Sequence, residues 1–280
     1  MPINCFTVDL EDWYQGIELP FDEWTNYENR IEIGLYKVLE LLQDHNTKAT
    51  FFTLGWVAEK YPNLIKQIHE QGHTLASHGY SHEKVYDLSK AEFREEIKRT
   101  KAEIEAITGT ELIAYRAPFF SITEKSLWAL QILAEEGYKI DSSISPVKTW
   151  RYGIENCPNE IFKFKEFDLI EFPVSAFTML KRKWAIGGAY FRLFPAALTN
   201  YYFNKRQKNN LDTVFYIHPW EYDPKHPVVE MERKAKFTHY VNLSKTASNT
   251  SKLLSKFTFT NLKDVLKLEH LPEYSVDYLG

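Results

Sequence analysis

The sequence predicts an α/β fold built on a parallel sheet, and three observations support this prediction. Short strand-like runs alternate with helical patterns, polar residues follow the strand-like runs, and 280 residues suffice for one large α/β domain. Strands that alternate with helices form parallel sheets, and repetition over this length favours a barrel over an open sheet. The sequence contains no internal repeat and no low-complexity segment.

Composition and charge exclude several classes of protein. The formal net charge is −4, so the basic excess needed to neutralise phosphates is missing and no nucleic-acid partner is expected. Hydrophobic residues make up 44% and charged residues 26% of the chain, which is typical of a globular protein with a sizeable core. With only Cys5 and Cys157, neither a disulfide framework nor a thiolate metal site is expected. Cys5 lies in an apolar run and is predicted to be a buried residue.

The N-terminus enters a strand-like run directly after Met1-Pro2-Ile3-Asn4. This start lacks the basic segment and apolar stretch of a signal peptide. A membrane span needs about 18 consecutive apolar residues, and the sequence has no such run. We therefore expect a cytoplasmic protein without a membrane span. The sequence predicts no oligomeric state.

The first elements along the chain are a strand, a long loop, a helix and a second strand. Residues 5–8 form a β-type run that ends in carboxylates, and an aromatic, acidic loop over 13–27 follows. Long loops of this kind are often functional. Apolar residues at helical spacing predict a helix over about 30–45, and the apolar run at 49–54 is expected to be a buried strand.

The next elements repeat this order with clearer boundary signals. Pro62 suits the start of a helix that ends at Gly72, and a third strand is expected over 73–77. Ser89-Lys90-Ala91-Glu92 has the pattern of a capping box and opens a helix that Gly109 closes.

The rest of the chain continues the pattern with one irregular stretch. A second capping box, Ser121-Ile122-Thr123-Glu124, is expected to open a helix ending at Gly137. Further strand-like runs lie at 112–115, 138–140, 169–174 and 213–217. Residues 181–210 are the least regular, and either an elaboration beside the substrate or a surface insertion fits them. Residues 244–270 are expected to form a closing helix, a short strand at 257–259 and a final helix.

Polar side chains that could take part in catalysis or metal binding follow five of the expected strands. They are Asp9 to Asp12, His78 with His82, Arg116, Asp141 and His218. Active sites of α/β proteins collect at the carboxyl ends of strands, so these groups are expected to meet. Solvated loop charges are the simpler explanation of any one of them, but five in one chain are hard to explain by folding alone.

His78 and His82 lie four residues apart in a polar turn with a glycine, where both imidazoles can point at one position. Imidazole is the commonest side-chain metal ligand, and two imidazoles with one carboxylate leave coordination positions open, as in catalytic zinc sites. A chance pair of loop histidines is the alternative.

The order of these motifs resembles the polysaccharide deacetylases with NodB homology, carbohydrate esterase family 4. The resemblance covers about residues 5–220 through Val8–Asp12, His78–His82, Arg116–Phe119, Asp141 and Ile217–His218. Within this family the chain is most similar to the exopolysaccharide-associated subgroup with an added C-terminal region, through Asp9–Trp13 and His218–Glu221. The resemblance implies a distorted, TIM-barrel-like (β/α) barrel of about seven parallel strands. It also implies a single domain over 1–280, with a C-terminal extension from about 221.

The resemblance also implies roles for individual residues. Asp9 would be the general base and His218 the general acid. Arg116 would orient Asp9, and Asp141 would hold Arg116 in turn. His78, His82 and a carboxylate would bind the metal, and the backbone N–H near Phe119 would help the metal to stabilise the oxyanion. Apart from the resemblance, Trp220 is expected to pack against the site wall or to stack on a sugar ring. The expected metal is Zn²⁺, with Co²⁺, Ni²⁺ or Fe²⁺ as alternatives.

One departure from the family pattern leaves the third metal ligand open. Many members have two adjacent aspartates in the first motif, but here Leu10 follows Asp9. The ligand must then be Glu11 or Asp12. Along a straight strand Asp9 and Glu11 point to the same side. The position where the chain leaves the strand slightly favours Asp12.

These residues supply each part needed for amide hydrolysis: a base, an acid and a metal. The preferred interpretation is a metal-dependent hydrolase that removes N-acetyl groups from an N-acetylated saccharide or polysaccharide, thus acting on a carbon–nitrogen bond other than a peptide bond. The first alternative is a related hydrolase of another such bond, in a ureide or imide. The second is a saccharide-binding protein without catalysis. Neither a Gly-x-Ser-x-Gly elbow nor a phosphate-binding glycine loop is present in the sequence.

Overall fold

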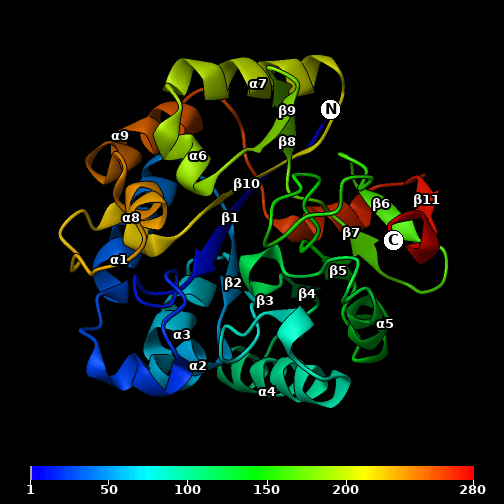
Figure 1. The fold of residues 1–280 in the computed structure, drawn as a ribbon, viewed down its shortest axis with the longest axis horizontal. Coiled ribbons are helices and arrows are strands. Elements are labelled where there is room, and N and C mark those ends of the chain that lie inside the picture. Colours follow the sequence, from blue (N-terminus) through cyan, green and yellow to red (C-terminus); the bar gives the residue numbers. More distant parts are fainter. Residues whose placement is uncertain (1) are drawn as a thin grey trace.

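The computed structural model describes residues 2–280, and its centre is a curled sheet of nine strands (Figure 1). The strands in spatial order are β10 (Thr213–Ile217), β1 (Asn4–Leu10), β2 (Thr50–Thr53), β3 (Thr74–Ser77), β4 (Ala114–Tyr115), β5 (Ile140–Asp141), β7 (Ile170–Glu171), β6 (Phe162–Phe164) and β11 (Glu273–Tyr274). From β10 to β7 all neighbours are parallel, whereas β6 runs antiparallel to β7. The predicted distorted barrel is confirmed as an open half-barrel.

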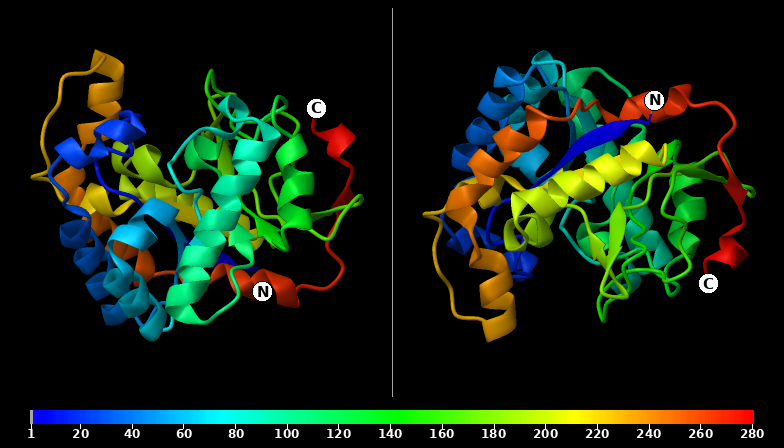
Figure 2. Two further views of the ribbon diagram at one scale, coloured as in Figure 1. Left: turned by 90° about the horizontal axis from the view of Figure 1, so that it is seen from below. Right: turned by 90° about the horizontal axis from the view of Figure 1, so that it is seen from above.

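Helices surround the curled sheet and alternate with its strands (Figures 1 and 2). The helices of the first half are α1 (Ile31–Asp44), α2 (Gly55–Lys60), α3 (Pro62–Glu70), α4 (Lys90–Thr108) and α5 (Trp128–Glu135). Those of the second half are α6 (Gly188–Leu193), α7 (Ala196–Lys208), α8 (Arg233–Tyr240) and α9 (Leu243–Leu254). Among the helices described, none combines the length and apolar character needed to cross a bilayer.

Strand β1 lies between β10 and β2, and all seven of its residues are buried. Successive side chains of a strand point to opposite faces. One set packs among the helices in the main apolar core: Phe6, Val8 and Leu10. The other set faces the inside of the half-barrel: Cys5, Thr7 and Asp9. A strand covered on both faces explains the apolar run seen in the sequence. Cys5 is buried, as expected, and Cys157 is a buried thiol as well.

The two predicted capping boxes gave one confirmed and one wrong prediction, while helix α3 begins at Pro62 as expected. The capping box of Ser89 and Glu92 is formed at the start of α4, and Gly109 ends this helix with φ +64°. The second capping box is not formed, because the Ser121 hydroxyl accepts the Val85 N–H instead. Helix α5 begins only at Trp128.

The stretch 181–210 is more regular than the sequence suggested. It contains the second strand of an antiparallel hairpin, β9 (Arg182–Ala185), which pairs with β8 (Ala176–Met179), and the helices α6 and α7. Near the C-terminus, the expected final helix is a 3-10 turn at Leu262–Lys267. The strand expected at 257–259 is reduced to a bridge between Thr260 and Cys5. The chain then passes along the sheet to β11, which pairs with β6 (Figure 2).

Helix α1 packs directly against the turn that follows β10, a 3-10 turn at Pro219–Tyr222. The approach is so close that a Cβ atom at Gly34 would lie 2.0 Å from the carbonyl oxygen of Pro219. Only glycine permits this contact, because a backbone carbonyl cannot move aside as a flexible side chain can. The contact fixes the turn that carries His218.

Candidate active site

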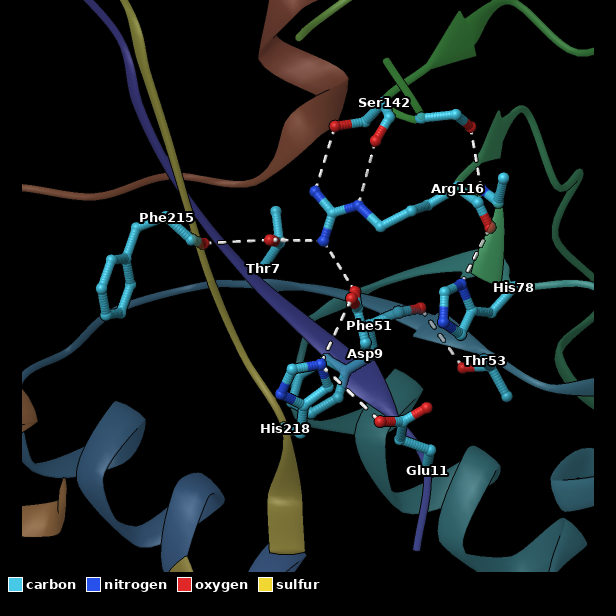
Figure 3. Close-up of polar contacts among 12 residues, drawn as sticks. Thr7, Asp9, Glu11, Phe51, Thr53, His78, Arg116, Ser142, Phe215 and His218 are labelled. Carbon is cyan, nitrogen blue, oxygen red and sulfur yellow. Dashed lines mark hydrogen bonds and ion pairs between the residues drawn. The ribbon is translucent and has the colours of Figure 1, made fainter. Parts of the chain in front are cut away.

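The carboxyl ends of β1, β3, β4 and β10 bring the sequence-predicted groups together at one edge of the half-barrel (Figure 3). Asp9, Glu11, His78 and His218 face a common cleft of about 450 Å³. Arg116 lies beneath this cleft and is fully buried. The clustering expected at the ends of parallel strands is therefore what the structure shows.

Glu11, His78 and His82 form a candidate metal site. One ligand atom from each lies within 4.8 Å of the others, and all three side chains are buried. Glu11 Oε2 is 2.7 Å from His82 Nε2. His78 Nδ1–H donates to the carbonyl oxygen of Arg116 at 2.8 Å, which leaves Nε2 of this ring free for the cluster. Two imidazoles and a carboxylate are a donor set that fits a divalent cation.

The electrostatics of the cluster favour the protonation states that a metal requires. Burial lowers the pKa of His78 to about 4, so its ring is neutral near pH 7. Burial alone would raise the pKa of Glu11, but His82 and His218 outweigh this effect and lower the pKa to about 2. A neutral imidazole and an ionised carboxylate are the forms that coordinate metals.

The structure does not place Asp12 in the cluster, so the preference for this residue is corrected. One carboxylate oxygen of Asp12 accepts the backbone N–H groups of Arg30 at 2.6 Å and Ile31 at 2.9 Å, and the other accepts the Trp13 N–H. Asp12 thus caps the N-terminus of α1 from a distant segment, where unpaired N–H groups attract an anion. Glu11 is the carboxylate that faces both histidines.

Asp9 is held by Arg116, as the family resemblance implied. Arg116 Nη1 donates to Asp9 Oδ1 at 2.6 Å and to Thr7 Oγ1 at 2.9 Å. The other carboxylate oxygen, Oδ2, lies 3.8 Å from His218 Nε2 and faces the cleft. The guanidinium also lies 4.0 Å from the centre of the Phe52 ring. Asp9 therefore has one anchored oxygen and one that is available to a reactant.

Asp141 does not hold Arg116 directly, which corrects the expected role. Ser142 does so instead, through its carbonyl oxygen at 3.2 Å from Nε and its hydroxyl at 3.0 Å from Nη2. Asp141 accepts a hydrogen bond from Ser143, whose hydroxyl in turn accepts the Ala117 N–H at 2.8 Å. Asp141 therefore fixes the backbone beside Arg116. Burial raises its pKa to about 6.

His218 has a carboxylate partner, Glu221, for which the sequence motif indicated no role. Its Nδ1–H donates to Glu221 Oε1 at 2.5 Å. The other oxygen of Glu221 accepts from Arg192 Nε at 3.2 Å, and both side chains are buried. Burial would lower the pKa of His218, but Glu11, Glu221 and Asp9 raise it to about 9. These carboxylates favour the protonated form of His218, which is the form that a general acid needs.

Arg192 connects this pair to the C-terminal region. Its Nη1 donates to the carbonyl oxygens of His239 at 2.7 Å and Val241 at 2.9 Å. It belongs to α6, within the stretch for which the sequence left two interpretations open. Because Arg192 lies at the cleft, the structure favours the first interpretation of residues 181–210, an elaboration beside the substrate. The spacing of three residues between His218 and Glu221 could have indicated the first partner, but no local signal indicates Arg192.

Trp220 forms part of the site wall. Its Nε1–H donates to Glu11 Oε1 at 3.1 Å, and its ring stacks between His218 at 5.2 Å and His239 at 4.1 Å. Burial, with help from neighbouring cations, lowers the pKa of His239 to about 2, so this ring stays neutral. Trp220 therefore supports the metal ligand. Phe119 also lines the cleft, and its ring lies 4.6 Å from that of His82.

We expect Glu221→Gln to lower kcat by about 10²-fold with little change in KM. Loss of the carboxylate charge removes a group that raises the pKa of His218, so the alkaline limb of the pH–rate profile should move to lower pH. Steady-state kinetics across pH check this result. Glu230→Gln, at a side chain that is 96% exposed, is the matched control and should change neither quantity. An unchanged alkaline limb in Glu221→Gln would contradict the assigned role.

Comparisons with known proteins define the class. Residues 17–140 match the family described as polysaccharide deacetylase, and residues 142–267 match a domain of unknown function, DUF3473. A solved structure from Mycobacterium smegmatis, described as a polysaccharide deacetylase, superposes with a TM-score of 0.67 at 17% identity, covering 95% of this chain and 88% of that one. A polysaccharide deacetylase from Bacillus cereus gives a TM-score of 0.51 at 15% identity, covering 98% and 96%.

Two curated relatives extend the comparison. A peptidoglycan-N-acetylglucosamine deacetylase of Bacillus cereus is 38% identical over 96 residues, which are 34% of this chain and 35% of that protein. A chitooligosaccharide deacetylase of Azorhizobium caulinodans is 30% identical over 129 residues, 44% of this chain and 59% of that protein. The chain thus spans less than two thirds of the length of either relative. It carries a polysaccharide deacetylase domain of the NodB-like group, carbohydrate esterase family 4, followed by DUF3473.

Proposed function

We propose that this protein is a metal-dependent hydrolase that removes N-acetyl groups from a saccharide or polysaccharide. The observation that supports this most is the pairing of Asp9 with Arg116 and of His218 with Glu221, both beside the cluster of Glu11, His78 and His82. A base, an acid and a candidate metal site thus face one cleft. The printed activities of the two curated relatives, on peptidoglycan N-acetylglucosamine and on chitooligosaccharide, support the same reaction.

Each residue of the site has one task in this reaction. A divalent cation held by the three-residue cluster would polarise the acetyl carbonyl and increase the acidity of a water molecule. Asp9 takes the proton of that water as its oxygen attacks the carbonyl carbon. His218 gives a proton to the nitrogen as the carbon–nitrogen bond breaks, and acetate and the free amine leave. Arg116 and Glu221 hold base and acid in place.

Zinc is the metal we propose, because two imidazoles and one carboxylate with open positions are a set that catalytic zinc uses. Cobalt, nickel and iron also suit these donors, and relative affinity alone does not select among them in a cell. We further propose a substrate from an exopolysaccharide pathway, which the motifs Asp9–Trp13 and His218–Glu221 support.

We expect the purified protein to release acetate from N-acetylglucosamine oligomers, and chelation of the metal to lower this rate by at least about 10²-fold. Zinc should restore the rate, and enzymatic measurement of acetate with parallel metal analysis checks both steps. A zinc-loaded protein that releases no acetate from any saccharide would refute the function. Ammonia or amine release from a ureide or imide in that case would favour the related hydrolase.

A further inference from the structure

Trp150 is a large apolar side chain that the site described so far does not use. It is 84% exposed, and it lines the same cleft as Asp9 and His218. Single exposed apolar residues are common on protein surfaces and need no explanation by themselves. An exposed indole at the edge of a candidate active-site cleft is different, because it offers a free aromatic face to whatever enters the cleft.

The backbone around Trp150 is fixed by a tight turn. The Thr149 N–H donates to the Tyr152 carbonyl oxygen at 2.8 Å, and the Thr149 hydroxyl accepts the N–H groups of Arg151 and Tyr152 at 3.2 and 3.0 Å. Gly153 follows with φ +100°, and a Cβ atom there would lie 2.1 Å from the carbonyl oxygen of Val147. A backbone that is already ordered loses little conformational freedom on binding, so less of the contact energy is spent on ordering the turn.

A row of stacked side chains connects Trp150 to the candidate metal site. The Arg151 guanidinium lies 4.7 Å from the Trp150 ring and 5.3 Å from the Phe119 ring. It is held by Glu18, 2.5 Å from Nη2. Phe119 in turn packs on His82. The cation thus covers one face of the indole, leaves the opposite face to solvent, and sets its place relative to the metal cluster.

We propose that the exposed face of Trp150 stacks against a second sugar ring of the substrate, next to the ring that is deacetylated. This inference rests on the proposed function and names its substrate class as a chain of at least two pyranose rings. One face of a pyranose presents C–H bonds with partially positive hydrogens, which are attracted to the negative face of an aromatic ring. Its hydroxyls can remain in water at the exposed edge of the cleft.

The position of Trp150 indicates that its partner is a second sugar ring and not the ring that reacts. Asp9 and the metal cluster are buried in the floor of the cleft and the His218 side chain is 18% exposed, whereas Trp150 is 84% exposed at the rim. The row through Arg151 and Phe119 separates the indole from His82. The ring whose acetyl group reaches the cluster then lies on the His82 side of this row, and the neighbouring ring of the chain takes the place on Trp150.

The test compares kcat/KM for the N-acetylglucosamine tetramer with that for the monomer. Trp150→Ala should lower the tetramer-to-monomer ratio about tenfold, since one aromatic stack is lost. Trp150→Phe should retain most of the ratio. Tyr201→Ala is the matched control, because Tyr201 is a 57% exposed aromatic residue on α7, outside the cleft lining. Bound zinc and circular dichroism should be the same in all variants.

A binding experiment separates this inference from the proposed function. Calorimetric titration of the tetramer into Asp9→Asn, with and without Trp150→Ala, measures stacking without turnover. About tenfold weaker binding in the double variant supports the platform even if the wild type releases no acetate. Equal affinities, an unchanged tetramer-to-monomer ratio, or no tetramer binding at all would overturn it.

Discussion

Asp9→Asn is expected to lower kcat by about 10³-fold while zinc remains bound, because it removes the proposed base and leaves the metal cluster intact. Asp9 contributes one oxygen to Arg116 and presents the other to the cleft, and it is not among the three side chains that converge as candidate ligands. The amide of asparagine can still accept the Arg116 hydrogen bond, so the fold should persist. Acetate release and metal content, measured on the same sample, check this prediction.

The control for this prediction is an aspartate of a different kind. Asp168 is 67% exposed and pairs with Lys139 and Lys163 at the surface, so Asp168→Asn should leave both activity and metal content unchanged. Loss of zinc from Asp9→Asn would show that base and ligand are exchanged in our assignment. Retained turnover would remove Asp9 from the role of base.

Glu11→Gln and Asp12→Asn are expected to have opposite consequences although the residues are adjacent. Glu11→Gln removes the charged oxygen that faces His82 and should weaken zinc binding by at least about 10²-fold, with turnover lost in proportion. Asp12→Asn should keep the metal and destabilise the protein by about 1–2 kcal/mol, since it weakens the cap of α1. The melting temperature should then fall by about 2–8 °C.

Competition with a chromophoric chelator measures the zinc affinity, and thermal unfolding measures the stability. Each variant serves as the control of the other, because both replace a buried carboxylate by its amide within one short segment. If Asp12→Asn lost its zinc and Glu11→Gln kept it, the cluster seen in the structure would not be the binding site.

The arrangement of strands and most of the site could be predicted because the signals are local. The alternation along β1, with apolar side chains toward the helices, places Asp9 inside the half-barrel by periodicity alone. His78 and His82 share one turn, so their proximity follows from four residues of spacing. The capping box at Ser89 and Glu92 also needs no information beyond its own segment. Such features can be predicted from the residues of one short segment.

Three features were decided only by contacts between distant segments. The Asp12 carboxylate binds the first N–H groups of α1, and Glu11 is the carboxylate that faces the cluster. The donors, the N–H groups of Arg30 and Ile31, lie 18 and 19 residues after Asp12 in the chain. Ser142 rather than Asp141 holds Arg116, because the guanidinium reaches past the strand end to the next residue. Arg192 meets Glu221 across 29 residues through helix α6, in the stretch where the sequence had no regular pattern.

The sequence by itself therefore determined which side chains come to the carboxyl edge of the sheet, and the tertiary structure decided which of them are partners. Strand order and side-chain alternation bring each group to the edge within a few ångströms. The choice between two adjacent carboxylates depends on where an orphan N–H group or an imidazole lies, and those positions are set by the packing of helices against the sheet. Hydrogen bonds formed in the tertiary structure distinguish Glu11 from the adjacent Asp12, whereas the periodicity of the sequence does not.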